Sequence, residues 1–195
     1  MSKDEEKMVK ALARVDITAD EAQAIEKLIA EQQYKEALAR CARAYSAPLG
    51  RLCMALTGSQ AEAEELTQET LIAAYDGFPQ FRFEGSVRSW LFGIARRICG
   101  RHNEMKNRRQ ARLRLVHDTG RGVDAGELHL ERERAIRARN ALADLKPSER
   151  EAVVLRYDGG LSFREVAAAC GVDEAAARKR VSRALSRLRE ALADG

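Results

Sequence analysis

The sequence predicts an all-α protein. Apolar residues recur at spacings of three and four along nearly the whole chain, which is the period of an amphipathic helix. Runs of β-branched residues and alternating strand patterns are absent from the sequence. Four segments match the capping box, in which a hydroxyl and a carboxylate three residues later satisfy the free amides at a helix start. They are Thr18–Glu21, Ser59–Glu62, Ser148–Glu151 and Ser162–Glu165.

The first third of the chain predicts several consecutive helices. Residues 1–30 form a charged amphipathic segment of one or two helices, interrupted at about residues 15–19. The next helical stretch contains Pro48. Because proline pushes the residue before it out of helical geometry, we expect one helix to end near Tyr45 and another to run to Gly58.

The middle of the chain predicts another helix, a basic segment and a linker. Ser59 caps the start of the helix, and Gly77 and Pro79 close it. After the basic segment, residues 115–130 contain three glycines and no sustained periodicity, which is typical of a flexible connection between domains. We therefore expect two small helical domains joined by a flexible linker.

The end of the chain indicates a helix-turn-helix unit. A short helix begins at Ser162, a break follows at Gly171–Val172, and Asp173 caps a new helix. The apolar residues expected to pack inward are Leu155, Leu161, Val166, Ala167, Val172, Ala177, Val181, Ala184, Leu185 and Leu188. Cations of the last helix then point outward, and a helix of this kind fits the DNA major groove. A basic surface helix in an ordinary bundle is the alternative.

Size and composition favour a soluble cytoplasmic protein. The 195 residues suit one ordinary domain or two small ones and exclude a large multidomain enzyme. Hydrophobic residues make up 45% and charged residues 33%, so the chain has enough apolar surface to fold. It has no run of about 18 apolar residues, and its first ten residues are charged, so we expect neither membrane insertion nor a signal peptide.

The cysteines predict neither a disulfide framework nor a metal site. Cys41, Cys53, Cys99 and Cys170 are widely scattered, and we expect them to be reduced. The nearest approach to a ligand pair is Cys99 with His102, but two ligands do not complete a tetrahedral site. We expect no metal and no other cofactor.

Charge is segregated along the chain although the net charge is only +4. Lys and Arg against Asp and Glu number 7 and 9 in residues 1–40, 2 and 5 in residues 41–80, and 10 and 3 in residues 81–120. The basic block at 82–114 would attract a polyanion such as DNA, while the acidic surface of residues 62–76 suits a protein partner. The alternative for the basic block is a face that is only solvated and has no DNA partner.

Aromatic residues gather just before the basic block. Six of the ten aromatic residues lie between Tyr75 and Phe92. Aromatic rings beside cations are typical of a surface for single-stranded DNA, because bases stack on the rings while arginines follow the backbone. A small helical domain also needs such rings in its core, so we expect about two of the six to be exposed.

The acidic helix provides no basis for catalysis. Its glutamates lack a partner histidine, and no nucleophile with an adjacent base occurs beside them. We therefore predict that the protein is not an enzyme. The acidic surface is either a solvated face or a docking surface for a basic or polar helix.

Three segments of the sequence form a recognisable set. They are AEAEELTQETLIAAYDGFPQF (61–81), SVRSWLFGIARRICGRHNEMKNRR (86–109) and LADLKPSEREAVVLRYDGGLSFREVAAACGVDEAAARKRVSRALSRLREAL (142–192). Together these segments resemble a known family, the extracytoplasmic-function (ECF) sigma factors of bacterial RNA polymerase. They occur in the family's order and separation, and the resemblance covers about residues 33–195. A helix-turn-helix is shared by many regulators, whereas an acidic helix followed by a basic helix with a tryptophan is much more specific.

The resemblance implies a transcription initiation factor that binds core RNA polymerase and directs it to specific promoters. It implies a sigma2-like domain at 31–114 for core polymerase and the minus-10 element, and a sigma4-like helix-turn-helix domain at 136–195 for the minus-35 element. Residues 115–135 would be the linker, and residues 1–30 an N-terminal extension. The implied partners are core polymerase, through its β′ clamp coiled coil and β flap, promoter DNA and an anti-sigma factor.

The resemblance also implies roles for individual residues. The expected contacts to the β′ clamp are Glu64, Glu65, Gln68 and Glu69. Those to the minus-10 strand are Arg88, Arg96, Arg97, Arg101 and Asn103, with Trp90 structural. Those to the minus-35 duplex are Arg178, Lys179, Ser182 and Arg183, with Arg164 and Arg180 on phosphates.

Three departures from the family pattern limit these implications. At 173–179 the chain has DEAAARK in place of the usual Pro-x-Gly-Thr-Val-Lys-Ser, so promoter sequence cannot be inherited. Arg97 stands where many relatives have asparagine, which puts the melting contact at that position in doubt. The extension at 1–30 fits a regulatory arm, an anti-sigma contact or a solvated tail equally well.

Two other function classes compete with initiation. One is a stand-alone helix-turn-helix transcriptional regulator that dimerises and never binds polymerase. The other is an adaptor that binds an anti-sigma factor without promoter activity. An initiation factor co-elutes with core polymerase, whereas the stand-alone regulator does not. An initiation factor also yields a run-off transcript, whereas the adaptor does not.

Overall fold

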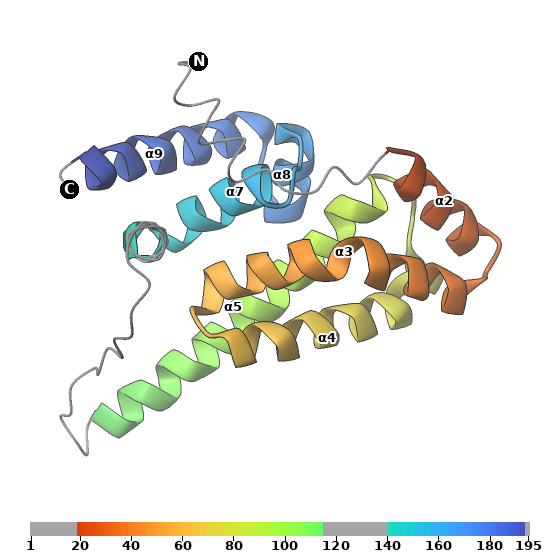
Figure 1. Cartoon of the computed structure of the whole chain (residues 1–195), viewed down its shortest axis with the longest axis horizontal. Helices are drawn as coiled ribbons and strands as arrows, with labels where there is room; N and C mark the ends of the chain where they lie inside the picture. Colours follow the sequence, from red (N-terminus) through yellow and green to blue (C-terminus); the bar gives the residue numbers. More distant parts are fainter. Residues whose placement is uncertain (1–18, 115–139, 194–195) are drawn as a thin grey trace, which may run out of the picture.

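The computed structural model describes residues 19–114 and 140–193, and within these ranges the chain is helical without a strand (Figure 1). The elements are α2 (Ala19–Ala30), α3 (Tyr34–Thr57), α4 (Gln60–Gly77), the 3-10 helix η1 (Phe78–Gln80), α5 (Val87–Arg114), α7 (Pro147–Tyr157), α8 (Phe163–Cys170) and α9 (Glu174–Ala193). The predicted all-α fold is confirmed. The expected linker at 115–135 and the expected interruption near residues 15–19 lie largely outside the described residues.

The helices form two units that pack against each other. Helices α3, α4 and α5 form one bundle, with α2 across the end of α3, and α7, α8 and α9 form the second unit. Helix α5 contacts α3 and α4 on one side and α8 on the other. Five consecutive residues, Leu91–Ala95, are therefore buried, which happens only where a helix is covered on all sides.

Pro48 does not split α3, which corrects the sequence prediction. The helix runs unbroken from Tyr34 to Thr57 with Pro48 inside it. Pro48 is buried beside Tyr45 and Leu49, both 0% exposed. A proline inside a helix removes one backbone hydrogen bond, and the burial of this continuous apolar stripe outweighs that loss.

The capping predictions have different outcomes. At Ser59 the hydroxyl accepts a hydrogen bond from the Glu62 amide at 3.4 Å, and α4 begins there and ends at Gly77 as expected. At Ser162 the complete capping box is present. Ser148 is wrong as a cap, because α7 begins one residue earlier at Pro147, and proline at the first helical position is itself a start signal.

Candidate nucleic-acid and protein interfaces

The helix-turn-helix unit has the predicted geometry. Helix α8 ends at Cys170, and the next residue, Gly171, has a φ of 65°, the left-handed conformation that glycine tolerates best. The Asp173 carboxylate then accepts a hydrogen bond from the Ala176 amide at 2.7 Å and caps α9. The inward residues of α9 are Ala177 (0% exposed), Val181 (2%), Ala184 (0%) and Leu188 (7%). Leu185, the remaining residue of the predicted stripe, is partly buried and packs against the core. The predicted inward stripe of the last helix is confirmed.

The four residues expected to contact minus-35 bases lie exposed on one face of α9. They are Arg178, Lys179, Ser182 and Arg183. Their spacings of one, four and five residues place them on adjacent turns. Arg178 is held in place within this face, because it bonds the Glu174 carboxylate at 2.6 Å and lies 4.4 Å from the ring centre of Phe163.

The two residues expected on phosphates are placed differently. Arg164 is exposed near the start of α8. Arg180 is half-buried on α9 near Cys170, and burial raises the pKa of that thiol. Arg164 is therefore the more accessible of the two to a DNA backbone.

The five residues expected to contact the minus-10 strand do not form one open surface. Arg97 and Arg101 are exposed on α5, and Arg101 is within 4.0 Å of Glu69. Asn103 instead donates a hydrogen bond to the Leu56 carbonyl at 2.9 Å. Arg88 and Arg96 both reach across to the second unit of the chain.

Arg88 and Arg96 have their partners on the second unit. The Arg88 guanidinium donates to the Gly159 carbonyl, with its Nε at 3.0 Å. The Arg96 Nε lies 2.8 Å from the Glu151 carboxylate, and the two side chains are only 27% and 14% exposed. The sequence contained no signal for either partner, because both pairs join residues more than fifty positions apart.

One of the six clustered aromatic residues is clearly exposed, where about two were expected. Phe83 is 49% exposed and has a φ of 56°, a backbone conformation that residues other than glycine rarely adopt. Phe78 and Phe92 are buried, and Tyr75, Phe81 and Trp90 are partly buried, with the Trp90 ring 5.1 Å from that of Phe81. This packing agrees with a structural role for Trp90.

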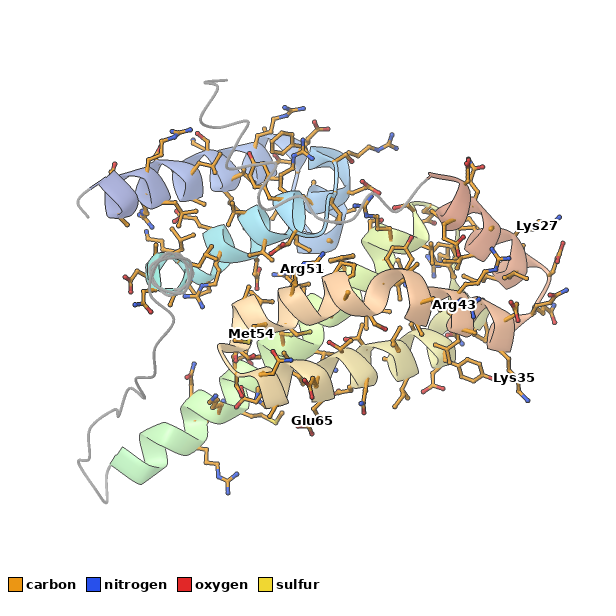
Figure 2. All side chains as sticks on the ribbon, viewed as in Figure 1. Lys27, Lys35, Arg43, Arg51, Met54 and Glu65 are labelled. Carbon is orange, nitrogen blue, oxygen red and sulfur yellow. The ribbon has the colours of Figure 1, made fainter. Side chains whose placement is uncertain are left out.

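The acidic face of α4 is open. Glu64, Glu65, Gln68 and Glu69 are all exposed, and Figure 2 shows Glu65 on the side of α4 that faces away from the bundle. Ile72 lies on the same side of the helix and is 63% exposed, which the sequence reasoning missed. Its spacing of three and four residues from Glu69 and Gln68 is the signal that would have placed it there. Ile72 therefore adds one apolar side chain to the acidic face.

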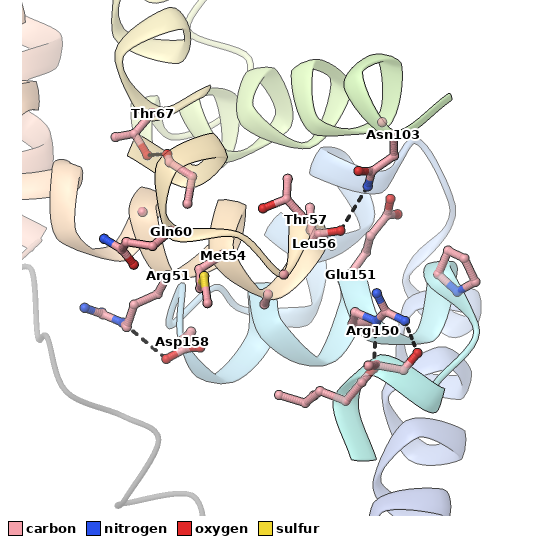
Figure 3. A pocket seen from close by; sticks show the side chains of 18 of the residues that line it. Arg51, Met54, Leu56, Thr57, Gln60, Thr67, Asn103, Arg150, Glu151 and Asp158 are labelled. Carbon is pink, nitrogen blue, oxygen red and sulfur yellow. Dashed lines mark hydrogen bonds and ion pairs between the residues drawn. The ribbon is translucent and has the colours of Figure 1, made fainter. Parts of the chain in front are cut away.

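A cleft lies where the ends of α3, α4 and α5 meet α7 (Figure 3). Its volume is about 1840 Å³. Its walls combine apolar residues such as Met54 with the Arg51–Asp158 ion pair, in which Nε and Oδ1 are 3.3 Å apart. Burial raises the pKa of Asp158, and the neighbouring Arg51 opposes that shift.

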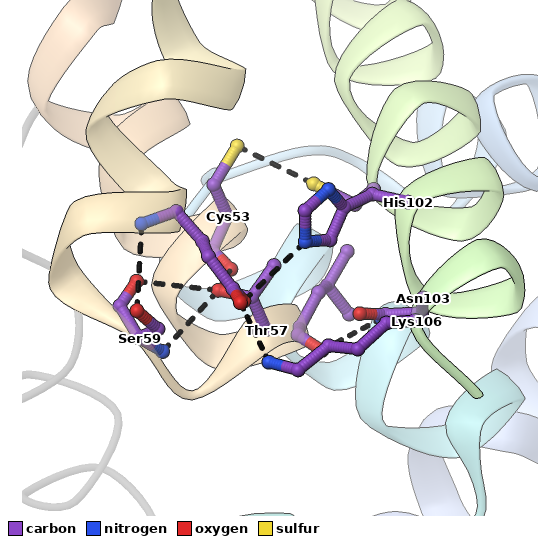
Figure 4. A network of polar contacts seen from close by, with 9 residues as sticks. Cys53, Thr57, Ser59, His102, Asn103 and Lys106 are labelled. Carbon is purple, nitrogen blue, oxygen red and sulfur yellow. Dashed lines mark hydrogen bonds and ion pairs between the residues drawn. The ribbon is translucent and has the colours of Figure 1, made fainter. Parts of the chain in front are cut away.

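A polar network joins α4 to α5 beside a pair of buried thiols (Figure 4). Glu62 lies 2.6 Å from the Lys106 Nζ and 3.5 Å from the His102 Nε2. The hydrogen bond from Lys106 is the main reason that the pKa of Glu62 is lowered. The sulfurs of Cys53 and Cys99 are 3.5 Å apart. In the part of the chain that the structure describes, no group of three or more His, Cys, Asp or Glu residues is arranged to hold a metal ion.

Within the described residues, a helical fold with a helix-turn-helix unit, a basic face on α9 and a separate acidic face on α4 is typical of DNA-binding transcription factors. Family models identify the branch of this class. "Sigma-70 region 2" matches residues 41–110, and "Sigma-70, region 4" matches residues 135–188. The chain belongs to the ECF sigma factors of the sigma-70 family.

Known proteins with similar sequences and structures support this assignment. The chain is 32% identical over 147 residues to the ECF RNA polymerase sigma factor EcfG of Rhodopseudomonas palustris, covering 72% of this chain and 76% of EcfG. It is 34% identical over 126 residues to the probable sigma-C factor of Mycobacterium bovis, covering 63% of this chain but only 65% of that protein. The sigma factor RpoE from Bartonella quintana, solved in complex with the anti-sigma factor NepR, matches with a TM-score of 0.63 and 27% identity, over 77% of this chain and 93% of RpoE.

No helix within residues 19–114 and 140–193 has the length and apolar character needed to cross a membrane.

Proposed function

We propose that this protein is a transcription initiation factor that binds core RNA polymerase and directs it to specific promoters. The observation that carries the proposal is the exposure of two chemically different faces on the two units that match the family. The acidic face of α4 lies in the part that resembles region 2, and the basic face of α9 lies in the part that resembles region 4. The protein would act in the cytoplasm and perform no chemistry of its own.

Each face has a proposed partner. Glu64, Glu65, Gln68 and Glu69 contact the β′ clamp coiled coil, and the helix-turn-helix domain at 136–195 contacts the β flap and the minus-35 duplex. The α9 face reads bases in the major groove, where each good bidentate contact contributes about 1–3 kcal/mol of discrimination. The domain at 31–114 captures the opened minus-10 strand through its α5 cations, and this capture must offset about 0.6–2.2 kcal/mol for each base step that opens.

An anti-sigma factor is the proposed negative regulator. The support is that the similar RpoE of Bartonella quintana was solved in complex with the anti-sigma factor NepR. The cleft between the bundle and α7 is large enough to receive part of a protein partner.

Reconstitution with purified core polymerase tests the proposed function. We expect the chain to co-elute with core polymerase in gel filtration and to yield run-off transcripts from a subset of promoters in genomic DNA. The stand-alone regulator would instead bind a palindromic duplex as a dimer without co-eluting with core polymerase. An adaptor would bind an anti-sigma factor and yield no transcript.

A further inference from the structure

Two of the four cysteines lie side by side inside the bundle that matches region 2. Cys53 of α3 and Cys99 of α5 are both 0% exposed, and their sulfurs are 3.5 Å apart (Figure 4). The Cys99 thiol donates a hydrogen bond to the Cys53 sulfur. The two residues are 46 positions apart in the sequence, and neither belongs to a proposed binding face. The fold therefore creates a pair of thiols that the proposed function does not use.

The sulfur contact is close to the geometry of a disulfide. A disulfide has an S–S length of about 2.05 Å, so the two sulfurs would have to approach each other by about 1.5 Å. Helices α3 and α5 already pack against each other, and rotation about χ1 moves the sulfur of each cysteine. The approach is thus the size of a side-chain adjustment rather than of a helix rearrangement.

The hydrogen bond makes the two thiols chemically unequal. It lowers the pKa of Cys53, because a donated proton stabilises the thiolate, and burial opposes this shift. The neighbouring Thr67 side chain of α4 lowers the pKa of Cys53 further. The same hydrogen bond raises the pKa of Cys99, and burial adds to that rise. Because the thiolate is the nucleophilic form, Cys53 is suited to attack an oxidant, with Cys99 as the resolving thiol beside it.

The cleft gives a small oxidant a route to the pair. Gly50 and Thr67 line the cleft near Cys53, and Gly100, the residue after Cys99, lines it on the α5 side. A Cβ placed on Gly100 would meet no atom within 4 Å, so open space lies next to the backbone there. Hydrogen peroxide is only slightly larger than water. It therefore needs far less local opening to reach the buried sulfurs than a bulky thiol reagent does.

We propose that Cys53 and Cys99 are a modification site at which hydrogen peroxide forms a reversible disulfide between α3 and α5. The Cys53 thiolate attacks one peroxide oxygen, so an S–O bond forms and the O–O bond breaks. The departing hydroxide takes up the proton that Cys53 released and leaves as water, and Cys53 becomes a sulfenic acid.

The second step closes the disulfide. The Cys99 sulfur attacks the Cys53 sulfur, the S–S bond forms and the S–O bond breaks. The oxygen leaves with the Cys99 proton as a second molecule of water. Overall the two thiols give up two electrons and two protons, and one peroxide is reduced to two molecules of water.

The disulfide would close a long loop of the chain. The loop spans the 46 positions from Cys53 to Cys99 and contains the whole of α4. Closing a loop of this length removes conformational entropy from the unfolded chain, so the oxidised form should resist unfolding better than the reduced form. The site is independent of the proposed function, and its test contains neither polymerase nor DNA.

Peroxide treatment of the full chain tests the site. After increasing times the chain is denatured, its free thiols are blocked with N-ethylmaleimide, and its peptides are analysed by mass spectrometry. We expect a linked peptide pair containing Cys53 and Cys99, lighter by two hydrogen atoms than the two separate peptides. These two thiols should disappear at least about tenfold faster than the thiol of Cys41. Dithiothreitol should restore both.

Cys41 is the internal control of this experiment. It is buried in the same helix, burial raises its pKa to about 12, and it lies about 18 Å along α3 from Cys53. Loss of all thiols at one common rate would overturn the proposal. Oxidation of Cys53 to a sulfinic acid without a link to Cys99 would overturn it as well.

The melting temperature gives a second readout that the variants can check. We expect the oxidised parent chain to melt at least about 5 °C above the reduced chain, and reduction to reverse the shift. Cys99→Ala and Cys53→Ala each remove one partner and should abolish both the link and the shift. Cys41→Ala removes a buried thiol from the same helix and should keep both. Far-UV circular dichroism checks that each variant is folded, and a shift that persists in either partner variant would contradict the proposal.

Discussion

Ser162 illustrates how a single residue fixes the start of the helix-turn-helix. Its hydroxyl accepts from the Glu165 amide at 3.2 Å, and the Glu165 carboxylate accepts from the Ser162 amide at 2.8 Å. These reciprocal bonds satisfy amides that the first turn of α8 leaves without a partner. The Glu165 carboxylate also accepts from Ser86, so the cap is tied to the interface between the two units.

We predict that Ser162→Ala lowers the free energy of unfolding by about 1 kcal/mol, the usual cost of losing a helix cap. Ser148→Ala is the matched control, because Ser148 lies in the same sequence pattern but sits inside α7 and does not cap it. Urea unfolding followed by circular dichroism measures both variants. Equal losses in the two variants would contradict the role of Ser162.

Glu62 should make stability depend on pH. The hydrogen bond from Lys106 is the main reason that the pKa of the Glu62 carboxyl lies below its ordinary value of 4.5. The partial burial of Glu62 opposes this shift. A lowered pKa in the folded state means that the stabilising contribution is present above pH 4.5 and is lost as the pH falls through the lowered value. We predict that the stability difference between the parent chain and Glu62→Gln shrinks as the pH falls from about 6 to about 3.

Thermal unfolding at a series of pH values measures this difference. Glu36→Gln is a suitable control, because Glu36 is 57% exposed and its distances to Arg40 and Arg43 are 3.9 Å. A difference that is constant across the range would show that the Glu62 network does not act through its charge.

At the scale of the element, α4 has a packed side and an exposed side. Ala63, Leu66 and Ala74 bury one side of the helix, and the glutamates with Ile72 occupy the other. A substitution on the exposed side therefore leaves the bundle intact. This separation makes the docking proposal testable by mutation.

We predict that Glu65→Lys reduces the affinity for core polymerase at least tenfold, because it places a cation in a face expected to meet a basic or polar helix. Duplex binding by α9 should not change. Glu36→Lys makes the same charge change at an exposed position of α3 and serves as the control. Fluorescence anisotropy with labelled chain and core polymerase gives the affinities, and equal losses in both variants would overturn the assignment of the face.

The α9 face gives the complementary prediction. Arg183→Ala should weaken specific minus-35 duplex binding by about 1–3 kcal/mol, the value of one bidentate base contact, and should leave core polymerase binding unchanged. Arg43→Ala removes an exposed arginine from α3 and is the control. Titration of specific and scrambled duplexes at fixed salt measures the effect, and an equal loss on both duplexes would assign Arg183 to the backbone rather than to bases.

Local rules predicted several helix ends correctly but not the continuity of α3. The cap at Asp173 and the end of α4 at Gly77 depend on neighbouring residues, so local sequence patterns predicted both. Pro48 was misjudged because burial within the bundle, which is a long-range effect, keeps α3 continuous. The faces of α4 and α9 followed from helical spacing, whereas the exposure of Ile72 depended on what the neighbouring helices leave uncovered.

At the scale of the whole molecule, the sequence could not show how the two units meet. Arg96 and Glu151 are 55 residues apart, and nothing near either position indicates the other. The basic charge of the middle segment predicted a DNA surface, but in the folded chain part of that charge is neutralised by the second unit. Charge counts along a sequence therefore overestimate the cationic surface that the folded chain presents.

The N-terminal segment is also joined to the rest of the molecule. Ile25 (0% exposed) and Ile29 (3%) of α2 lie in the core beside α3. The Glu26 carboxylate accepts a hydrogen bond from the Val87 amide at 2.8 Å and so satisfies an amide at the start of α5. The proposed domain boundary at residue 30 stays a prediction, but α2 shares its packing with the bundle that follows.

We predict from this packing that Ile25→Ala lowers the free energy of unfolding by about 2–5 kcal/mol, the usual cost of removing a large buried side chain. The effect should extend beyond α2, because the loss of its packing also releases Glu26 from the start of α5, one residue before Arg88. Gln23→Ala, at an exposed position of the same helix, should change stability by less than about 0.5 kcal/mol. Urea unfolding with hydrogen exchange along α5 measures both effects. If Ile25→Ala is as stable as Gln23→Ala, α2 is an appendage rather than part of the folded unit.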